Sequence, residues 1–595
     1  MYNFAMIGNC NVSALIATNG DIAWCCLPNP DSEPVFGNML DQNGGVFKIT
    51  VLEKELTLSQ NYIKNTNIVE TIINNKENKI SIVDFSPRFY KNDKIYMPKI
   101  LVRKIIPLSL NPNLKILIQP VEGWNKKKSQ FKICSNFLNF KLSKGELKIF
   151  SSLDLSQLKN EFTISISKPI YFVLAWDDEE ILLNHIEQDC EDLFSQTLKY
   201  WRNWVKHTSL PSLFQREVIR SALLLKLHCH EPSGAILASI STSLPEEWNA
   251  NRNWDYRFCW IRDAYFTIIS FYKLGHFEEI ISILKFILKI IKNLDENQII
   301  LKPVYAIDGT LPLPETEIKN WTGYQNNSPV RTGNQAAEHI QNDVYGEVLN
   351  ILLLLYCDEK FIELRDDYYI EIIEQLLLNC YHLRNVPDAG IWEIRNNWTV
   401  HSFTSIMSLH AIKRVKFLLN RKILQFKNNN MYKIFEEIEE SLLKCVKDKI
   451  LFGDITTQFL DASSLNIIKY QLLTKEIQKE TLLKIFQELS FNNKSLNNFS
   501  FIYRYKKLDD FGIPKTPFLL CSFWFIEALT KQNKFFIARR ALKNILRASN
   551  HVGLFAEHFC PQENLQLGNF PQCYSHAGLI HAAFAVSPSW DDIEH

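Results

Sequence analysis

The chain has 595 residues, which is more than one hydrophobic core usually fills, so its length predicts two or three domains. Hydrophobic residues make up 46% and charged residues 22%, a composition typical of soluble globular proteins. The 66 Lys and Arg residues balance 65 Asp and Glu residues, for a net charge of +1. This balance provides no basic field for nucleic acid, so we expect a neutral substrate and no nucleic-acid partner.

Three features of the sequence bear on its compartment. The N-terminus has no positive segment followed by a sustained apolar run, which argues against a secretory signal. Apolar runs such as residues 280–291 contain lysines and are too short to span a bilayer, so no membrane partner is expected. The 13 scattered cysteines, with Cys25 beside Cys26, predict a reducing compartment and hence a cytoplasmic location. The sequence leaves open whether the protein is delivered into another cell without a secretory signal. It also leaves the oligomeric state open.

Residues 1–183 show the short alternating pattern of an N-terminal antiparallel β-sandwich. Apolar and polar residues alternate with a period of two, and turn clusters such as residues 43–45 separate the runs. Strands of this kind bury one face against a second sheet. The clearest predicted strands cover residues 47–51, 80–85, 132–140 and 162–168.

The hydrophobic period changes towards 3.6 over residues 181–198, which predicts a linker helix within residues 184–211. Helical periodicity then dominates residues 212–595, the predicted catalytic domain. Because eleven or twelve helices are too many for a simple bundle, paired helices in a closed ring are the expected packing. The predicted helices cover residues 214–229, 264–274, 277–291, 344–356, 368–383, 400–418, 432–447, 481–488, 519–529, 535–548 and 575–586.

Residues 252–263 combine aromatic and ionic side chains in a way that a core helix would not tolerate. Aromatic faces stack on the C–H faces of a sugar ring, and charged groups bind its hydroxyls, so this mixture suits a carbohydrate site. A structural ion-pair cluster beside a helix N-terminus is the alternative. The aromatic residues are Trp254, Tyr256, Phe258 and Trp260, and the charged ones are Asp255, Arg257, Arg262 and Asp263.

Hydrolysis of a glycosidic bond needs one carboxylic acid to protonate the leaving oxygen and one carboxylate to activate water or attack carbon. Glu393 follows a loop marked by proline and glycine and adjoins Trp392. An aromatic wall of low polarity would raise the pKa of such a carboxyl group, as a general acid requires. The alternative is a carboxylate at a helix N-terminus that pairs with Arg395.

Glu557 is the candidate general base. It lies in a glycine- and proline-marked connection that leads into the last predicted helix, where a carboxylate can project without being buried and unpaired. Alternatively it is a loop residue satisfied by His558 or by a backbone amide. We find no serine elbow, phosphate-binding loop or dinucleotide fingerprint, and residues 228–230 do not have the spacing of metal ligands on one helix face. No cofactor and no metal are therefore expected.

Six blocks of the sequence, in order, resemble glycoside hydrolase family 15, which contains glucoamylases, glucodextranases and trehalases. The resemblance covers nearly the whole chain and is to the bacterial members. The most specific block joins Ser241-Thr-Ser-Leu-Pro-Glu-Glu247 to Asn253-Trp-Asp-Tyr-Arg-Phe-Cys-Trp-Ile-Arg-Asp-Ala264. The other blocks are residues 7–28, 328–338, 390–393, 518–524 and 567–572.

This resemblance implies a multidomain β + α protein, with an N-terminal antiparallel β-sandwich, a linker helix and an α/α barrel of six helix pairs. It implies that Glu393 is the general acid and Glu557 the general base. Arg262 and Asp263 would bind the hydroxyls of the terminal glucose, between walls formed by Trp260 and Trp392. The family inverts the anomeric centre, so the two carboxyl groups should stand about 6.5–9.5 Å apart with a water beside the base.

The sequence departs from the family pattern at three places, and these leave the linkage preference open. Ile394 follows the predicted acid where fungal relatives have a second acidic residue. Asn249-Ala250 and Lys515-Thr516 replace a glycine pair and an acidic residue that are common in relatives. The leading prediction is an exo-acting, inverting α-glucosidase of glucoamylase type, acting on glycogen- or starch-like α-glucans or another α-glucoside. A trehalase and a catalytically inactive carbohydrate-binding protein are the alternatives.

Overall fold

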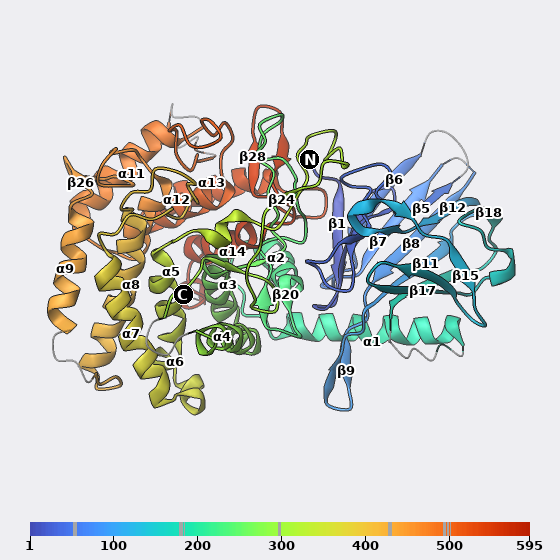
Figure 1. The fold of residues 1–595 in the computed structure, drawn as a ribbon, viewed down its shortest axis with the longest axis horizontal. Coiled ribbons are helices and arrows are strands. Elements are labelled where there is room, and N and C mark those ends of the chain that lie inside the picture. The colour runs from blue at the N-terminus through green and yellow to red at the C-terminus, as the bar shows by residue number, and fades with distance from the viewer. Residues whose placement is uncertain are drawn as a thin grey trace.

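The computed structural model describes the whole chain except residues 52–55, 76, 178–182, 184, 295–298, 427–430, 492–494, 497–498, 500 and 595. The protein is elongated, with a β-rich N-terminal part at one end and a helical part at the other (Figure 1). The N-terminus lies near the boundary between the two parts (Figure 1). This arrangement matches the predicted order of a sandwich followed by helices.

The N-terminal part is a sandwich of two antiparallel sheets, as predicted. The first sheet has the order β1 (Phe4–Gly8), β2 (Ser13–Ala17), β3 (Ile22–Cys26), β5 (Val46–Val51), β12 (Asn113–Gln119), β18 (Glu161–Ser165), and β4 (Pro34–Phe36) also pairs with β3. The second has the order β15 (Phe131–Ile133), β16 (Leu138–Leu142), β17 (Gly145–Ser151), β19 (Ile170–Trp176), β11 (Ile100–Pro107), β8 (Lys79–Phe85), β7 (Val69–Asn74), β6 (Thr57–Tyr62).

Period-two patterning fixes which side chains fill the sandwich core. On β5, Phe47, Ile49 and Val51 are buried while Lys48 is exposed, as expected for a strand with one face against a second sheet. Phe47 reaches Phe172 on the opposing sheet, with ring centroids 5.3 Å apart.

The predicted strands at 47–51, 80–85 and 162–168 correspond to β5, β8 and β18. The single strand predicted at 132–140 is wrong. The chain turns within it, where the Cys134 amide donates to the Phe137 carbonyl at 2.9 Å, and β15 pairs with β16 as a hairpin. The alternation breaks at Ser135-Asn136, two consecutive polar residues of the kind that form turns, and this signal was missed.

Helix α1 (Ile186–Lys206) runs beneath the sandwich and leads to the barrel (Figure 1). The last strand of the sandwich ends at Trp176, and the first helix of the barrel, α2 (Gln215–His228), begins at Gln215. The domain boundaries at 183/184 and 211/212 fall in the connections between these elements, and we retain them as a proposal.

The helical part is an α/α barrel in which an inner ring of helices packs inside an outer one. The inner ring consists of α3 (Ile261–Leu274), α5 (Asp343–Leu352), α8 (Ser402–Asn420), the short pair η5 (Ala462–Leu465) and α10 (Asn466–Lys469), α12 (Leu519–Lys531) and α14 (Cys573–Val586). Each inner element packs against an outer helix, in the order α4 (Phe277–Lys292), α7 (Asp367–Leu383), α9 (Met431–Leu443), α11 (Lys475–Leu489), α13 (Phe535–Ile545) and α2.

Burial follows from these positions. All of residues 519–530 on the inner helix α12 are buried, whereas the outer helix α13 buries only a stripe formed by Ala538, Ala541, Leu542 and Ile545. An inner helix contacts protein on every side, so it is buried all round, whereas an outer helix buries one face and is amphipathic. The sequence did not predict η5 and α10, because four residues each are too few to establish a helical period.

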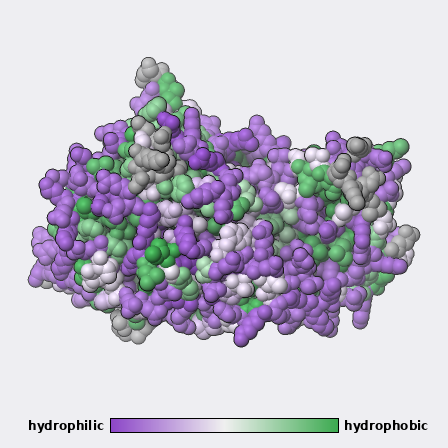
Figure 2. All heavy atoms as spheres, turned by 90° about the horizontal axis from the view of Figure 1, so that it is seen from above, coloured by the Kyte–Doolittle hydropathy of each residue, from purple (hydrophilic) through white to green (hydrophobic). Residues whose placement is uncertain are grey.

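Within the described residues, none of the helices is long and apolar enough to cross a bilayer. The face drawn in Figure 2 is mostly hydrophilic, and apolar residues form small separate groups on it. Such scattered apolar residues are ordinary for a protein surface.

Candidate active site

A funnel lies among the connections that lead into the inner helices of the barrel. It consists of three adjoining chambers, and Tyr256 and Glu393 line all of them. The chambers have volumes of about 520, 370 and 200 Å³, and we call them outer, middle and inner. Their further lining residues include Arg252, Trp254, Arg395, Asp509, Asp510 and Phe511 (outer), Phe518, Trp524 and Glu557 (middle), and Trp260, Asp263 and Gln572 (inner).

The segment 252–263 divides its side chains between two environments. Trp254, Tyr256 and Trp260 line the funnel, as predicted for a sugar site. Asp255 and Arg257 instead form a buried ion pair with each other, with Arg257 Nη2 2.7 Å from Asp255 Oδ2. Arg257 also donates to the Ser32 carbonyl of the sandwich. The prediction that Asp255 and Arg257 fix sugar hydroxyls is therefore wrong, and for these two residues the structural alternative holds.

Glu557 is buried at the edge of the middle chamber. Its Oε1 accepts hydrogen bonds from the hydroxyl groups of Tyr256 (3.0 Å) and Tyr574 (3.1 Å). Burial is the main cause that raises the pKa of Glu557 well above its usual range, and the nearby Glu246 carboxylate raises it further. Among the described residues, its Oε2 has no hydrogen-bond partner, and His558 Nε2 lies 3.6 Å away. The alternative of a loop carboxylate satisfied by His558 therefore does not fit.

Glu393 follows a tight turn in which its amide donates to the Gly390 carbonyl. Its backbone is left-handed (φ 60°), a conformation that costs a non-glycine residue on the order of 1 kcal/mol and often marks a functional site. Oε1 accepts from Trp260 Nε1 (2.7 Å) and Arg262 Nη2 (3.2 Å). The predicted alternative, a pair with Arg395, is wrong.

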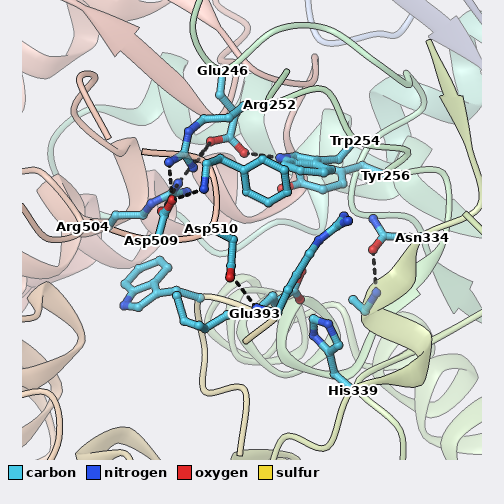
Figure 3. A pocket seen from close by; sticks show the side chains of 15 residues that line it. Glu246, Arg252, Trp254, Tyr256, Asn334, His339, Glu393, Arg504, Asp509 and Asp510 are labelled. Atoms are coloured by element: carbon cyan, nitrogen blue, oxygen red, sulfur yellow. Dashed lines mark hydrogen bonds and ion pairs between the residues drawn. The ribbon is translucent and has the colours of Figure 1, made fainter. Parts of the chain in front are cut away.

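Arg395 is directed elsewhere in the outer chamber. Its Nη2 lies 2.9 Å from Glu315, and its guanidinium group stacks over the Trp254 ring at 4.9 Å. Its backbone amide donates to Asp510 at 2.7 Å, which joins the loop that carries Glu393 to the loop around Asp510. Figure 3 shows Asp510 reaching towards this loop, with Arg252, Arg504 and Asp509 clustered to one side.

The first turn of α3 holds the two residues predicted to bind the terminal sugar. Arg262 lines the middle and inner chambers and donates to Gln341 Oε1 at 3.2 Å as well as to Glu393. Asp263 lines the inner chamber, and its Oδ1 has no partner among the described residues. Burial raises the pKa of Asp263 to about 7, with Arg262 acting in the opposite direction.

The two tryptophans predicted as walls lie in different parts of the funnel. Trp260 lines the inner chamber, and Trp392 lines the outer and middle chambers. Trp392 Nε1 donates to Asp461 Oδ2 at 2.8 Å, and its ring lies against Phe518 with centroids 5.5 Å apart. These contacts fix the orientation of the Trp392 ring beside Glu393.

Several lining residues were not singled out from the sequence. Glu246 accepts from Trp254 Nε1 (2.6 Å) and from Arg504 (3.2 Å). Although burial acts in the opposite direction, Arg504, His558 and Arg252 hold the pKa of Glu246 below its usual value. Glu246 lies in the sequence block 241–247 that resembles the family, so that block could have indicated it. The sequence around Arg504 contains no such block. The other lining residues are Gln572 and Tyr574. Gln341 lies behind the lining and donates to Glu393 at 3.4 Å.

Glu246, Glu557 and His558 each place a potential ligand atom within 4.8 Å of the others. Two guanidinium groups already neutralise Glu246, with Arg504 at 3.2 Å and Arg252 at 3.9 Å. A divalent cation bound here would lie beside both positive groups, so this cluster is a poor cation site.

Comparison with known proteins identifies the family. The model of glycosyl hydrolases family 15 matches residues 214–584, and that of a trehalase-like N-terminal domain matches residues 2–105. Trehalase 1 of Sulfolobus acidocaldarius is 30% identical, covering 98% of both chains. The trehalase of Thermoplasma volcanium is 28% identical, covering 97% of this chain and 92% of the relative.

A crystal structure of a bacterial glucoamylase in complex with acarbose has the same fold. Its TM-score is 0.69 at 14% identity, covering 98% of this chain and 94% of the glucoamylase. The predicted fold, an antiparallel sandwich followed by an α/α barrel, is confirmed. Because the family model matches residues 214–584, well over half of the chain, this protein belongs to glycosyl hydrolases family 15 and is a glycoside hydrolase.

Proposed function

We propose that this enzyme hydrolyses α,α-trehalose to two glucose molecules. The observation that carries the proposal is the similarity, over nearly the full length of both chains, to proteins named trehalase. The sequence alone favoured a glucoamylase-type activity on α-glucans and held trehalase as the alternative. The relatives' names support that alternative better, since the likeness to a glucoamylase rests on fold at 14% identity.

The chambers fit the two halves of a disaccharide. The inner chamber combines the Trp260 ring with Arg262 and Asp263, a mixture of apolar face and charged groups suited to one glucosyl unit. The outer chamber offers Trp254 and Phe511 beside several charged side chains, which suits the leaving glucose. The glycosidic oxygen would then lie in the middle chamber, which both Glu393 and Glu557 line.

In this arrangement Glu393 is the general acid. Its carboxyl group donates a proton to the glycosidic oxygen as the bond to the inner glucosyl carbon breaks. Trp260 and Arg262 hold its Oε1, so the group keeps one orientation throughout the reaction. After proton transfer the new carboxylate is stabilised by the Arg262 guanidinium group.

Glu557 is the general base in the same proposal. Its carboxylate takes a proton from a water molecule that attacks the anomeric carbon from the face opposite the leaving glucose. The Tyr256 and Tyr574 hydroxyls hold Oε1, so the position of the carboxylate is fixed. A general base must be ionised before it can accept a proton. Because the pKa of Glu557 is raised, the loss of activity at acidic pH should begin at a higher pH than for an ordinary carboxyl group.

Polar contacts join the loops that border the outer chamber, and such a fixed border favours a short substrate. Arg252 Nη2 lies 2.6 Å from Asp509, and Asp510 binds the backbone of the loop that carries Glu393. These contacts tie together three loops that border the chamber, which carry Arg252, Asp509 and Glu393. A long glucan would require this border to stay open beyond the second sugar.

A substrate panel tests the proposal. Purified enzyme is given trehalose, maltose, maltotriose, isomaltose and glycogen, and released glucose is followed over time. We expect kcat/KM for trehalose to exceed that for every other substrate by at least about a hundredfold, since specificity rests on differential transition-state binding. Preference for maltotriose or glycogen would establish a glucoamylase instead. Binding of trehalose with no glucose released would support a carbohydrate-binding protein.

Glu393→Gln separates the acid from the base. Because protonation matters least for a good leaving group, this variant should lose far more activity on trehalose than on α-glucosyl fluoride. Equal losses on the two substrates would remove Glu393 from the acid role.

A further inference from the structure

Gln572 is buried in the inner chamber with its side-chain amide unpaired. It precedes α14, and its backbone amide donates to the Phe555 carbonyl at 2.9 Å, so its position is fixed. Among the described residues, neither Oε1 nor Nε2 has a hydrogen-bond partner.

The other buried glutamines of the described chain differ from Gln572 in this respect. Each uses its Nε2 as a donor within the protein. Gln60 donates to the Ala17 carbonyl (2.9 Å), Gln341 to Glu393 (3.4 Å), Gln478 to the Leu472 carbonyl (2.9 Å), and Gln566 to the Ala548 and Leu554 carbonyls (2.7 and 2.8 Å). Burial of an amide without partners costs folding free energy. An unpaired amide that lines a chamber is therefore available to a ligand.

Other polar groups of the inner chamber are mostly engaged. Trp260 and Arg262 donate to Glu393, and the Tyr574 hydroxyl donates to Glu557. Asp263 Oδ1 is also unpaired, and in its ionised form this carboxylate can only accept hydrogen bonds. Gln572 adds both an acceptor and a donor, held close together on one planar group.

We propose that Gln572 is a specificity-determining residue that binds two neighbouring ring hydroxyls of the glucosyl unit in the inner chamber, donating to one and accepting from the other. The inference rests on the proposed function, because it takes a glucosyl unit as the occupant of this chamber. A carboxamide matches a pair of adjacent hydroxyls, since each hydroxyl can donate or accept. A sugar lacking either hydroxyl would leave the buried amide half-unpaired and would be rejected.

The test compares Gln572→Met with wild type on α-glucosyl fluoride and on its 2-, 3-, 4- and 6-deoxy forms. Fluoride needs little protonation, so the comparison reports binding of the inner sugar. Gln572→Met should lower kcat/KM on α-glucosyl fluoride by about tenfold to a hundredfold. For the two deoxy forms that lack a hydroxyl bound by Gln572, the loss of kcat/KM should be clearly smaller. The two missing hydroxyls must belong to neighbouring ring positions. Equal losses on all five substrates would overturn the proposal.

Two further measurements separate recognition from a structural role. Gln572→Met should unfold at the same or a higher temperature than wild type, because it removes an unpaired buried amide. Gln566→Met is the matched control: it loses two backbone hydrogen bonds, so its melting temperature should fall while discrimination among the deoxy substrates stays unchanged. A fall in the melting temperature of Gln572→Met like that of the control, without altered discrimination, would mean a structural role.

A second variant keeps the test decisive if Gln572→Met does not fold. Gln572→Glu keeps the acceptor and, at the alkaline end of the pH range where its carboxyl group is ionised, removes the donor. Under those conditions the dependence on one of the two hydroxyls should disappear and the dependence on the other should remain. If the dependence on both hydroxyls disappears, or the dependence on neither, the proposed pairing is contradicted. Failure of trehalose hydrolysis with an intact deoxy pattern would refute the proposed function alone. Trehalose hydrolysis without that pattern would refute this inference alone.

Discussion

A buried ion pair in the sandwich and two buried carboxylates in the funnel differ in how their polar atoms are paired. In the sandwich, Arg103 binds Asp84 through two hydrogen bonds of 2.8 and 3.1 Å and also donates to the Gly20 and Phe47 carbonyls. In the funnel, Asp263 Oδ1 and Glu557 Oε2 are buried without a partner among the described residues. The buried Arg103 has all of these partners within the protein, and its bonds hold the two sheets in place. The unpaired buried atoms of the funnel can instead receive hydrogen bonds from a substrate.

This difference makes opposite predictions for the two regions. Removing a paired charge should damage stability and leave catalysis intact in the molecules that stay folded. Removing a funnel group should damage catalysis and leave stability unchanged or improved.

The largest effect is expected for Glu557→Gln. Loss of the general base should lower kcat on trehalose by about 10²- to 10⁴-fold, while glucose still binds, because the base acts in the transition state. Its thermal unfolding should occur at or above the wild-type temperature. Wild-type-like turnover would exclude Glu557 from the mechanism, and calorimetric titration with glucose serves as the control for an intact pocket.

The counterpart in the sandwich is Arg103→Met. This change leaves the buried Asp84 carboxylate without its partner and should lower the free energy of unfolding by about 3–5 kcal/mol. Denaturant titration measures this loss, and kcat/KM at a temperature where the variant is folded should stay near wild type. The double variant Arg103→Met, Asp84→Leu should recover part of the stability. A large catalytic defect in folded Arg103→Met would break the division between the two regions.

Arg262→Lys should have an intermediate effect. The guanidinium fork donates to both Glu393 and Gln341, and an ammonium group cannot reproduce that geometry. We expect kcat/KM to fall by about tenfold to a hundredfold with an unchanged thermal transition. Should the variant lose its thermal transition instead, Arg262 would belong to a structural ion-pair cluster, the alternative interpretation of residues 252–263.

The smallest effect is a shift of the pH profile in Glu246→Gln. The charged groups that face Glu557 are Glu246, Arg504 and, when protonated, His558. Burial raises the pKa of Glu557 most, and the Glu246 carboxylate raises it further. The base must be ionised, so kcat/KM falls as pH drops below this pKa. Removing the Glu246 charge should therefore move the acidic limb of the kcat/KM profile to lower pH. An unchanged limb, or a shift to higher pH, would contradict this coupling.

Sequence patterning predicted most of the fold because strands with one buried face alternate with a period of two, and long helices show a period near 3.6. It failed for η5 and α10, which are too short for a period, and for the hairpin from β15 to β16, whose polar turn Ser135-Asn136 was missed. In the site, motifs located Glu393, Glu557 and Arg262. They could not show that Asp255 and Arg257 face the sandwich, since that depends on the packing of the two domains.

Arg504 and Gln572 also required the structure. Arg504 binds Glu246, which is 258 residues away in the chain, and no local pattern encodes such a contact. Gln572 stood within a recognised motif, but its role depends on the absence of partners in the folded protein, which becomes visible only when every neighbouring donor and acceptor is placed.

The central claim, inverting hydrolysis of trehalose by Glu393 and Glu557, is tested most directly by proton NMR of fresh product. If water attacks opposite the leaving group, one glucose inverts to the β anomer while the leaving glucose keeps its α configuration. Spectra read before mutarotation should therefore show α- and β-glucose in equal amounts from trehalose. Initial formation of α-glucose alone would indicate a retaining mechanism with a covalent intermediate, and the base role of Glu557 would have to be abandoned.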